Sequence, residues 1–281
     1  MKNFKYLFLV LCTIFVLEMI SFNKAEAACT ITSGVVTVNG CDSKPDLYEI
    51  VIYKLYLCTS IPTKPTTSST VVLTPCSQIF NNASGATASV TQGSDIDLDG
   101  IYTRPPNGTY THGYAYMDNT FGITWSGKID GQKNGHTGGR GAYCATVANS
   151  GTHAQGSTHT NSSVCSADDD LTAGKFVETL EQFGGHTDSF LSRATASNIN
   201  GTTASIVGLL VDDNEHRAAT TGEVEKLEGL VTFANPVVVT TATTSLNMSF
   251  NVGEGMHFGD HLNNDTLDIG GGPFQAIMEA N

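Results

Sequence analysis

The chain has 281 residues, of which only 15% are charged, and its 27 acidic side chains against 14 basic ones give a formal net charge of −13 at pH 7. This acidic excess argues against nucleic acid and anionic membrane surfaces as partners, because both are negatively charged themselves. Beyond the first 27 residues, no apolar run reaches the roughly 18 residues that a membrane-spanning helix needs. The length suits one large domain or two small ones.

The first 27 residues are predicted to be a signal peptide. Two lysines provide a basic start, residues 6–16 form an apolar segment, and Ala25-Glu26-Ala27 is a small-residue cleavage site. A lipoprotein signal would place a Leu-like residue where Glu26 stands ahead of Cys29, so we favour simple secretion. Cleavage would remove three lysines and two glutamates and leave a mature chain with a formal net charge of −14.

Six cysteines remain in the mature chain, and an even number after an export signal is typical of a disulfide-bonded protein. Their spacing predicts bonds between sequence neighbours, namely Cys29–Cys41, Cys58–Cys76 and Cys144–Cys165. Each bond would close a short loop and contribute roughly 3 kcal/mol by restricting the unfolded chain. Zinc binding is the alternative, but no Cys-x2-Cys pair supports it.

The N-terminal part of the mature chain reads as strands. Residues 30–38 predict a β-hairpin with its turn near Ser33-Gly34, tied by the first disulfide. Residues 47–58 are nearly all β-branched, aromatic or aliphatic and contain no Gly or Pro, which predicts one long central strand covered on both faces. Strict alternation places Leu55 and Leu57 on the face of Val51. A buried helix is the alternative, disfavoured because β-branched residues lose freedom there and no cap precedes them.

The middle of the chain changes character twice. A turn is expected at 81–85, and residues 110–117 and 121–125, joined by Asp118-Asn119, predict an aromatic-rich hairpin. The segment from about residue 130 to about residue 168 is rich in Gly, Asn, His, Ser and Thr. This composition predicts a long polar loop, called the polar excursion below, that the third disulfide closes. A helix is then predicted over 171–183, because acidic residues precede it and apolar residues recur at helical spacing.

The remaining residues return to strand patterns. Runs at 205–211, 229–233, 237–241 and 246–252 are followed by three glycines and a final apolar segment at 274–278. Strands with turns every 8 to 12 residues or so predict an all-β fold. We expect residues 28–281 to form a single domain, a β-sandwich or jelly roll with one short helix and long disulfide-stapled loops.

Three aspartates form the sharpest local pattern in the chain. Asp95, Asp97 and Asp99 alternate ahead of Gly100, as at the start of a calcium-binding loop. The glutamate expected six residues after the glycine is missing, because Pro106 stands there. The alternative is a strand or loop whose aspartates face water without a metal. We expect no cofactor other than a structural calcium ion at this place, where it would brace a loop.

Histidines offer a weaker metal-binding pattern. Candidate transition-metal ligands are His257, Asp260 and His261, joined by His136, His153 and His159 from the polar excursion. The glycine-rich surroundings of His257 oppose a helix that would bring two histidines together, so solvent-facing side chains are the favoured alternative. No Gly-x-Ser-x-Gly or His-Glu-x-x-His motif occurs, and an extracellular hydrolase is the least favoured function. We expect no enzymatic activity and no catalytic residues.

Export, local disulfides, sparse charge and β-rich termini together resemble secreted bacterial pilin-like and biofilm-fibre β-sandwich subunits of the donor-strand type. The resemblance is one of architecture and involves no shared sequence motif. It implies a structural subunit of an extracellular filament or pilus-like fibre, assembled through β-strand pairing or donor-strand exchange between copies. The candidate subunit-interface residues are Thr30, Ile31, Val35, Val36 and Val38 near the N-terminus, and Phe274 and Ile277 near the C-terminus.

The alternative function is a secreted carbohydrate-binding or adhesive β-sandwich domain. Exposed aromatic rings stack on sugars, and the candidates are Tyr102, Tyr110, Tyr114, Tyr116 and Trp125. The alternative is that these rings are buried in the core, which is the commoner position for aromatic side chains. Self-association is the partner expected in the first case and a glycan in the second. Both functions place the protein outside the cell or on its surface, with no membrane contact after signal cleavage.

Overall fold

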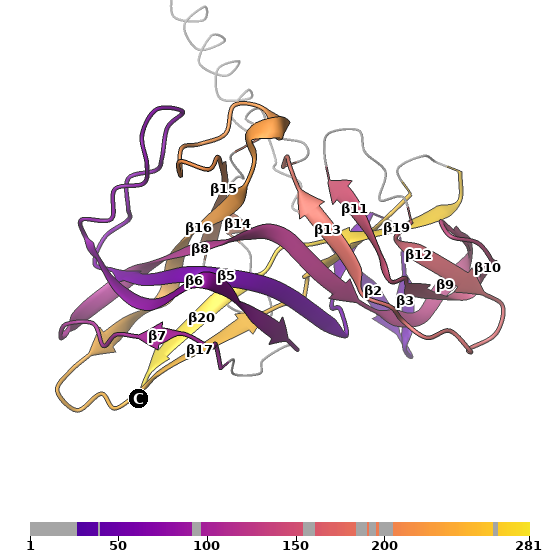
Figure 1. Cartoon of the computed structure of the whole chain (residues 1–281). Helices are drawn as coiled ribbons and strands as arrows, with labels where there is room; N and C mark the ends of the chain where they lie inside the picture. Colours follow the sequence, from indigo (N-terminus) through magenta and orange to yellow (C-terminus); the bar gives the residue numbers. More distant parts are fainter. Residues whose placement is uncertain are drawn as a thin grey trace, which may run out of the picture.

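The computed structural model describes residues 27–38, 40–91, 97–153, 161–183, 190, 195–196, 205–260 and 264–281. Within these residues the chain forms three β-sheets (Figure 1). The predicted signal peptide lies outside the described residues except for Ala27. In the described part of the chain, no helix is long and apolar enough to cross a membrane.

The large sheet contains nine strands, namely β5 (Leu47–Cys58), β6 (Cys76–Val90), β7 (Ile101–Tyr102), β8 (Gly108–Thr124), β11 (Asn149–His153), β13 (Phe176–Leu180), β14 (Thr195–Ala196), β15 (Ser205–Val211) and β16 (Lys226–Val239). Seven of them follow the order β14-β15-β16-β8-β5-β6-β7. The other two strands extend the sheet beside the C-terminal half of β8. There β13 pairs with β8, and β11 pairs with β13. The long strands β5, β8 and β16 therefore form the centre of the molecule.

The second sheet also contains nine strands, namely β1 (Ala27–Ala28), β2 (Thr30–Thr32), β3 (Val35–Thr37), β4 (Cys41–Ser43), β9 (Ser126–Gly135), β10 (Arg140–Thr146), β12 (Ser163–Ser166), β18 (Met256–Gly259) and β19 (Thr266–Gly271). Its main path is β1-β4-β18-β19-β9-β10-β12, with β3 added to β9 and β2 added to β3. The third sheet is the pair β17 (Leu246–Asn251) and β20 (Gln275–Ala280). A single 3-10 turn, η1 (Thr221–Glu223), interrupts the described strands.

Strand β5 has the bounds that the sequence predicts, Leu47–Cys58, and lies between β6 and β8. Its two faces differ from strict alternation because the pairing with β6 shifts between Ile52 and Lys54, as at a β-bulge. Tyr53 and Lys54 both leave the face of Ile52, and Leu55 and Leu57 return to it. The predicted grouping of these two leucines with Val51 is therefore wrong.

One face of the large sheet, here called the inner face, packs against the other two sheets. Ile52 and Met117 of the large sheet share one apolar core with Phe258 of the second sheet and Phe250 of the third. Phe258 also meets the ring of Trp125 edge-on, with 4.7 Å between the ring centroids. This packing of sheet against sheet confirms an all-β, sandwich-like fold.

The opposite face, here called the outer face, is also covered. Tyr114, Leu209 and Leu230 form a second apolar cluster with Val71, which belongs to the loop 59–75. The loop is held in turn by the backbone N–H of Arg217, which donates to the carbonyl of Thr66 at 3.0 Å. The central strands are therefore buried on both sides, as expected from their composition.

The helix predicted over 171–183 is wrong. Residues 171–175 are irregular, and 176–180 form β13, in which Phe176 and Glu178 are buried. The backbone of β13 pairs with β8 on one side and β11 on the other. Backbone hydrogen bonds to strands on both sides stabilise the extended conformation more than the local sequence stabilises a helix. The helix prediction depended only on preceding acidic residues and on the spacing of apolar residues.

Strands β6 and β8 continue through the two predicted turns at 81–85 and at Asp118-Asn119, so neither turn reverses the chain. At 82–85, however, β6 bulges away from β5, the Ser84 N–H donates to Asn82 Oδ1 at 2.9 Å, and Gly85 has a φ of 81°. Asp118 pairs with Lys226 of β16, and the side-chain amide of Asn119 donates to the carbonyl of Leu180 at 3.0 Å. Partners distant in sequence thus hold polar residues in an extended conformation that local signals disfavour.

The polar excursion expected at about 130–168 contains paired strands. It includes most of β9 and all of β10, β11 and β12. Cys144 and Cys165 lie directly opposite one another on β10 and β12, joined by a disulfide with Cα atoms 4.1 Å apart. The three predicted disulfides are all present. Backbone pairing and a covalent link therefore order a segment that has few apolar side chains.

Candidate functional site

The hairpin of β2 and β3 carries the N-terminal candidate interface residues. Its turn uses Ser33 (φ 52°) and Gly34 (φ 79°), and positive φ at both positions matches the twist of a two-residue hairpin. β3 pairs in parallel with β9, whereas β2 pairs with β3 and with no other described strand. The outer edge of β2, here called the β2 edge, therefore has no partner among the described strands.

The five N-terminal candidates differ in exposure. Thr30 and Ile31 are exposed, and Ile31 exposes 57% of its surface; Val35 and Val38 are half-buried, and Val36 is buried in the core. The disulfide between Cys29 and Cys41 closes the base of this segment. The hairpin is fixed to its own subunit, and its free surface is the β2 edge.

The C-terminal candidates are built into the subunit. Phe274 is buried, and its ring centroid lies 5.7 Å from that of Tyr48 and 5.9 Å from that of Phe250. Ile277 is half-buried on β20, opposite Ser249 of β17. The two candidate segments belong to different sheets, and the structure does not pair them with each other.

A second exposed edge, which sequence patterns did not single out, lies at β7. Ile101 and Tyr102 expose 68% and 59% of their surfaces, and β7 pairs with β6 but with no described strand on its other side. The Tyr102 hydroxyl fixes the preceding turn by donating to the carbonyl of Leu98 at 2.7 Å. We call this open side of β7 the β7 edge.

A pocket of about 230 Å³ lies beside the β7 edge. Its apolar lining comes from the inner face of the large sheet and from the third sheet, and includes Leu55, Phe80, Val239, Leu246, Met248 and Met278. Leu98 and Tyr102 line it on the side of β7, and Arg104 and Thr244 contribute polar groups. Such a pocket can receive an apolar side chain.

The aspartates of the predicted calcium site are only partly described. Asp97 and Asp99 lie within the described residues that immediately precede β7, whereas Asp95 lies outside the described residues. No group of three His, Cys, Asp or Glu side chains suited to a metal occurs in the described part. Calcium binding by Asp95, Asp97 and Asp99 stays a prediction.

The described histidines of the weaker metal pattern are each paired with a separate carboxylate: His257 with Asp42 at 2.9 Å, His136 with Asp268, and His153 with Glu178 at 3.7 Å. His159 and His261 lie outside the described residues. Asp260 contacts Lys133 at 3.3 Å and does not join these pairs. The structure therefore does not gather the candidates into one site.

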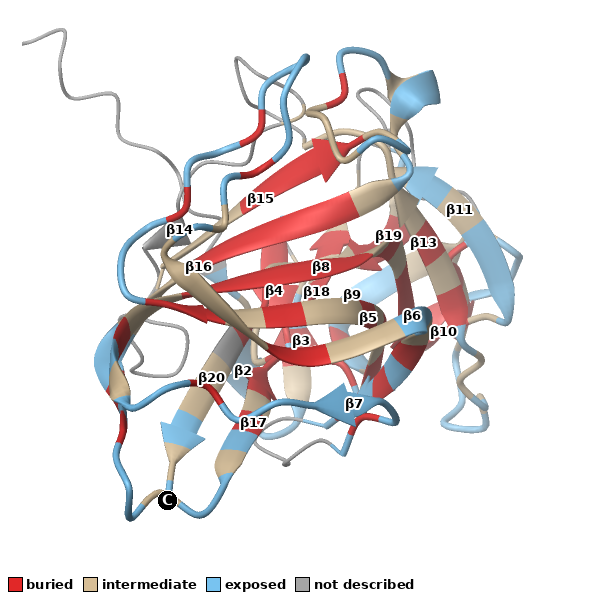
Figure 2. Cartoon of the chain, turned by 60° about the vertical axis from the view of Figure 1, so that its left-hand side comes forward, coloured by how far each residue is buried: buried red, intermediate tan, exposed pale blue. Residues whose placement is uncertain are grey.

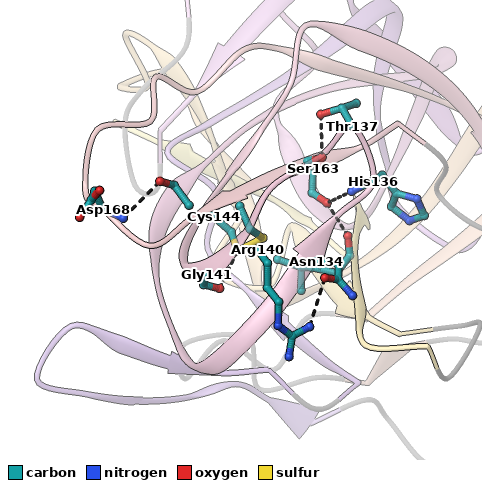
Figure 3. The surroundings of a disulfide bond; sticks show 11 residues. Asn134, His136, Thr137, Arg140, Gly141, Cys144, Ser163 and Asp168 are labelled. Carbon is teal, nitrogen blue, oxygen red and sulfur yellow. Dashed lines mark hydrogen bonds between the residues drawn. A yellow bond between two sulfur atoms is a disulfide. The ribbon is translucent and has the colours of Figure 1, made fainter.

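Ser163, His136 and Asp268 lie close together, and Figure 3 shows Ser163 and His136 beside the third disulfide. The aspartate labelled in the figure is Asp168, whose backbone N–H donates to the Ser166 hydroxyl. The Ser163 hydroxyl donates to the carbonyl of Leu267 at 2.5 Å and accepts the backbone N–H of His136 at 3.2 Å. The His136 ring pairs with Asp268, and Ser163 is fully buried. A catalytic serine must be hydrogen-bonded to a ring nitrogen of the histidine and must be accessible to the substrate. Ser163 contacts the backbone N–H of His136 and is buried, so these bonds are structural.

The outer face holds a buried carboxyl group. Glu228 on β16 is fully buried, and the Tyr114 hydroxyl donates to its Oε1 at 2.9 Å. Its Oε2 has no hydrogen-bond partner among the described residues. Burial raises the pKa of Glu228 to about 8, although the bond from Tyr114 acts in the opposite direction. Glu215 contributes to the rise in pKa and is itself paired with Lys54 at 2.6 Å.

No protein-family model matches the chain, and neither a curated protein nor a solved structure matches it. Function therefore has to follow from the chain's own geometry. The features that face solvent and bear on binding are the β2 edge, the β7 edge and the adjoining pocket.

The aromatic residues considered for sugar stacking are mostly inaccessible. Tyr110, Tyr114, Tyr116 and Trp125 are 9% exposed or less, and Tyr102 alone presents its ring to solvent. Four of the five candidates therefore belong to the core, which is the alternative expected for such rings. Tyr114 and Tyr116 lie on the outer face beneath the loops, and their pKa values are raised by burial.

Proposed function

We propose that the protein is a structural subunit of an extracellular filament or pilus-like fibre, in which copies associate by β-strand pairing. The observation that carries the proposal is the presence of two short strands, β2 and β7, that each have one edge unpaired by any described strand. The sequences of β2 (Thr-Ile-Thr) and β7 (Ile-Tyr) contain neither charge nor proline and expose large apolar side chains. Proteins that must stay monomeric usually block such edges with lysine, proline or a covering loop.

Two further features support an extracellular role. Three disulfides in a chain of this size suit an oxidising compartment. The predicted signal peptide would deliver the chain there.

The geometry favours edge pairing over complete strand exchange. Donation of residues 30–38 to a neighbour would remove Val36 from the core and break the pairing of β3 with β9. The bond between Cys29 and Cys41 would also force the hairpin to move as a unit. Donation of the C-terminal segment would remove Phe274 from its aromatic neighbours. Addition of a strand to the β2 edge breaks none of these contacts.

Electron microscopy and sedimentation of the mature chain, residues 28–281, test this function. We expect ordered fibres whose amount rises with protein concentration, and the same fibres on the surface of the source cells when labelled with antibody to this chain. A chain that stays monomeric at every concentration and labels no fibre on cells would contradict the proposal.

The carbohydrate-binding alternative rests on one exposed ring. Tyr102 adjoins the pocket and could stack on a sugar. Retention of a monomer on a polysaccharide column, lost in Tyr102→Ala, would favour this function over the fibre subunit.

A further inference from the structure

We infer that the pocket beside β7 binds a small aliphatic carboxylate, with the alkyl chain among the apolar residues of its floor and the carboxylate at Arg104 on its rim. Such binding does not depend on fibre formation. Ligand pockets commonly combine an apolar lining with a few polar groups that fix the orientation of the ligand. The floor, the rim and the volume of this pocket each restrict the ligand.

The floor of the pocket is apolar. The pocket lies where β7 approaches the pair of β17 and β20, and Figure 2 shows β7 exposed at this end of the molecule. Leu55, Phe80 and Val239 line it from the inner face of the large sheet, and Met248 lines it from β17. All four side chains are at most 8% exposed. A water molecule among them would lack polar partners, so an apolar group is favoured there.

The rim contains a cation that is fixed in place by neutral groups. Among the described residues that line the pocket, Arg104 alone carries a charge. Its Nη2 donates to the carbonyl of Thr240 at 2.7 Å and to Oδ1 of Asn107 at 2.9 Å, and its Nη1 donates to the carbonyl of Pro105 at 3.2 Å. The guanidinium has further N–H groups, which can donate to a carboxylate.

The missing counter-charge indicates an anionic ligand. No carboxylate within the described ranges forms an ion pair with Arg104. This is informative in a chain with 27 acidic side chains against 14 basic ones, where Arg140, for comparison, contacts Asp265 at 2.7 Å. Asp97 and Asp99 precede β7 in the sequence and do not line the pocket. A ligand carboxylate would therefore supply the partner that the protein does not.

The volume limits the length of the alkyl chain. The pocket holds about 230 Å³, whereas cavities of roughly 150 Å³ accommodate the six-carbon ring of benzene. In proportion, a chain of roughly eight carbons fills the pocket. Octanoate is therefore the probe that matches both the length and the charge.

Isothermal titration calorimetry of the mature chain with octanoate, octanol and octylammonium separates the chain from the charge. The three probes share an alkyl chain and have a negative, a neutral and a positive head group. We expect wild type to bind octanoate at one site, about tenfold tighter than octanol, because hydrogen bonds between charged groups are stronger than neutral ones. Octylammonium should bind most weakly, because Arg104 repels it.

Two substitutions locate the site. Arg104→Gln removes the charge from the rim and should abolish the preference for octanoate while leaving the affinity for octanol unchanged, which shows that the pocket is intact. Arg140→Gln is the matched control, since Arg140 is also exposed but lies on β10 and does not line the pocket. Leu246→Trp places a larger side chain in the wall of the pocket and should weaken the binding of octanoate and octanol alike.

Three results would each overturn the inference. The first is equal affinity of wild type for octanoate and octanol, or no saturable binding of octanoate up to about 10 mM, where even millimolar affinity is detected. The second is octanoate binding that is unchanged in Arg104→Gln or weakened equally in Arg140→Gln. The third is binding of both probes that is unchanged in Leu246→Trp, which would place the site elsewhere.

Discussion

The inner and outer faces of the large sheet are built on the same strands but are buried by different chemistry. On the inner face, Ile50, Ile52 and Leu57 pack against the other two sheets through aliphatic and aromatic contacts. On the outer face, tyrosines lie beneath two loops together with Glu228 and the pair of Lys54 and Glu215. The bulge after Ile52 makes the difference, since it turns both Tyr53 and Lys54 outward.

This difference teaches that one sheet can hold a carboxyl group with a raised pKa on one face, at Glu228, and purely apolar packing on the other face, around Ile52. Apolar packing responds to volume and leaves protonation unaffected. A buried carboxyl group responds to pH, because its protonation in the folded state differs from that in the unfolded chain. Three predictions separate the two faces.

The largest expected effect concerns Glu228 on the outer face. Its pKa in the folded state is about 8 against a usual 4.5, so the folded protein retains a proton that the unfolded chain releases. The stabilising contribution is complete below pH 4.5 and is lost as pH rises toward 8. At about 1.4 kcal/mol for each pH unit, the ceiling is about 5 kcal/mol.

Urea unfolding of wild type and Glu228→Gln at a series of pH values from 4 to 9 or so checks this prediction. The glutamine variant keeps a group that can accept the Tyr114 hydrogen bond but does not titrate. We expect the free energy of unfolding of wild type, relative to the variant, to fall with pH across that window. Parallel pH profiles for the two proteins would show that Glu228 does not titrate with a raised pKa.

A smaller effect is expected from Ile52→Ala on the inner face. The side chain is fully buried between sheets, and its truncation leaves a cavity that costs about 3 kcal/mol of unfolding free energy. The loss should be equal at pH 5 and pH 8, in contrast to the outer face. Val238→Ala, at a position 50% exposed, is the control and should cost no more than about 0.5 kcal/mol. A pH-dependent loss in Ile52→Ala would couple the two faces and break the comparison.

The smallest effect is expected from Tyr114→Phe. Removal of the hydroxyl deletes the bond to Glu228 and should cost about 1 kcal/mol at pH 6, where Glu228 is protonated. Because that bond lowers the pKa of Glu228, its loss should raise this pKa further and extend the pH-dependent window upward. Tyr56→Phe removes a hydroxyl from the neighbouring ring, 5.5 Å away between centroids, that is not bonded to Glu228. An identical shift in both variants would rule out the specific bond.

Sequence patterns predict the features that depend on near neighbours. The bounds of β5 follow from its uninterrupted β-forming composition, and the turn at Ser33-Gly34 follows from residues that tolerate positive φ. The disulfide pairs follow from the short spacing of successive cysteines, such as Cys58 and Cys76, which are 18 residues apart. These features need no knowledge of the rest of the chain.

Local sequence patterns do not predict the features that depend on partners distant in the sequence. β13 forms a strand because β8 and β11 lie on either side of it, and β8 continues through Asp118-Asn119 because β16 pairs with it. The contact between Tyr114 and Glu228 joins residues that are 114 positions apart in the sequence. The one local pattern that indicates it is a glutamate placed among apolar residues. Of the candidate assembly site, sequence reasoning finds Ile31 but misses the β7 edge, because the pocket forms where five separate segments converge.

The disulfide between Cys58 and Cys76 has a consequence for survival outside a cell. These cysteines face each other at the end of the ladder between β5 and β6, so the bond closes the loop 59–75 at its base. Surface loops are the preferred places for proteolytic cleavage. A protease that cuts this loop would produce two polypeptides that stay joined by the disulfide and by the strand pairs behind it. The nicked molecule would keep its sheet, and an assembly made of such molecules could outlast damage to its exposed loops.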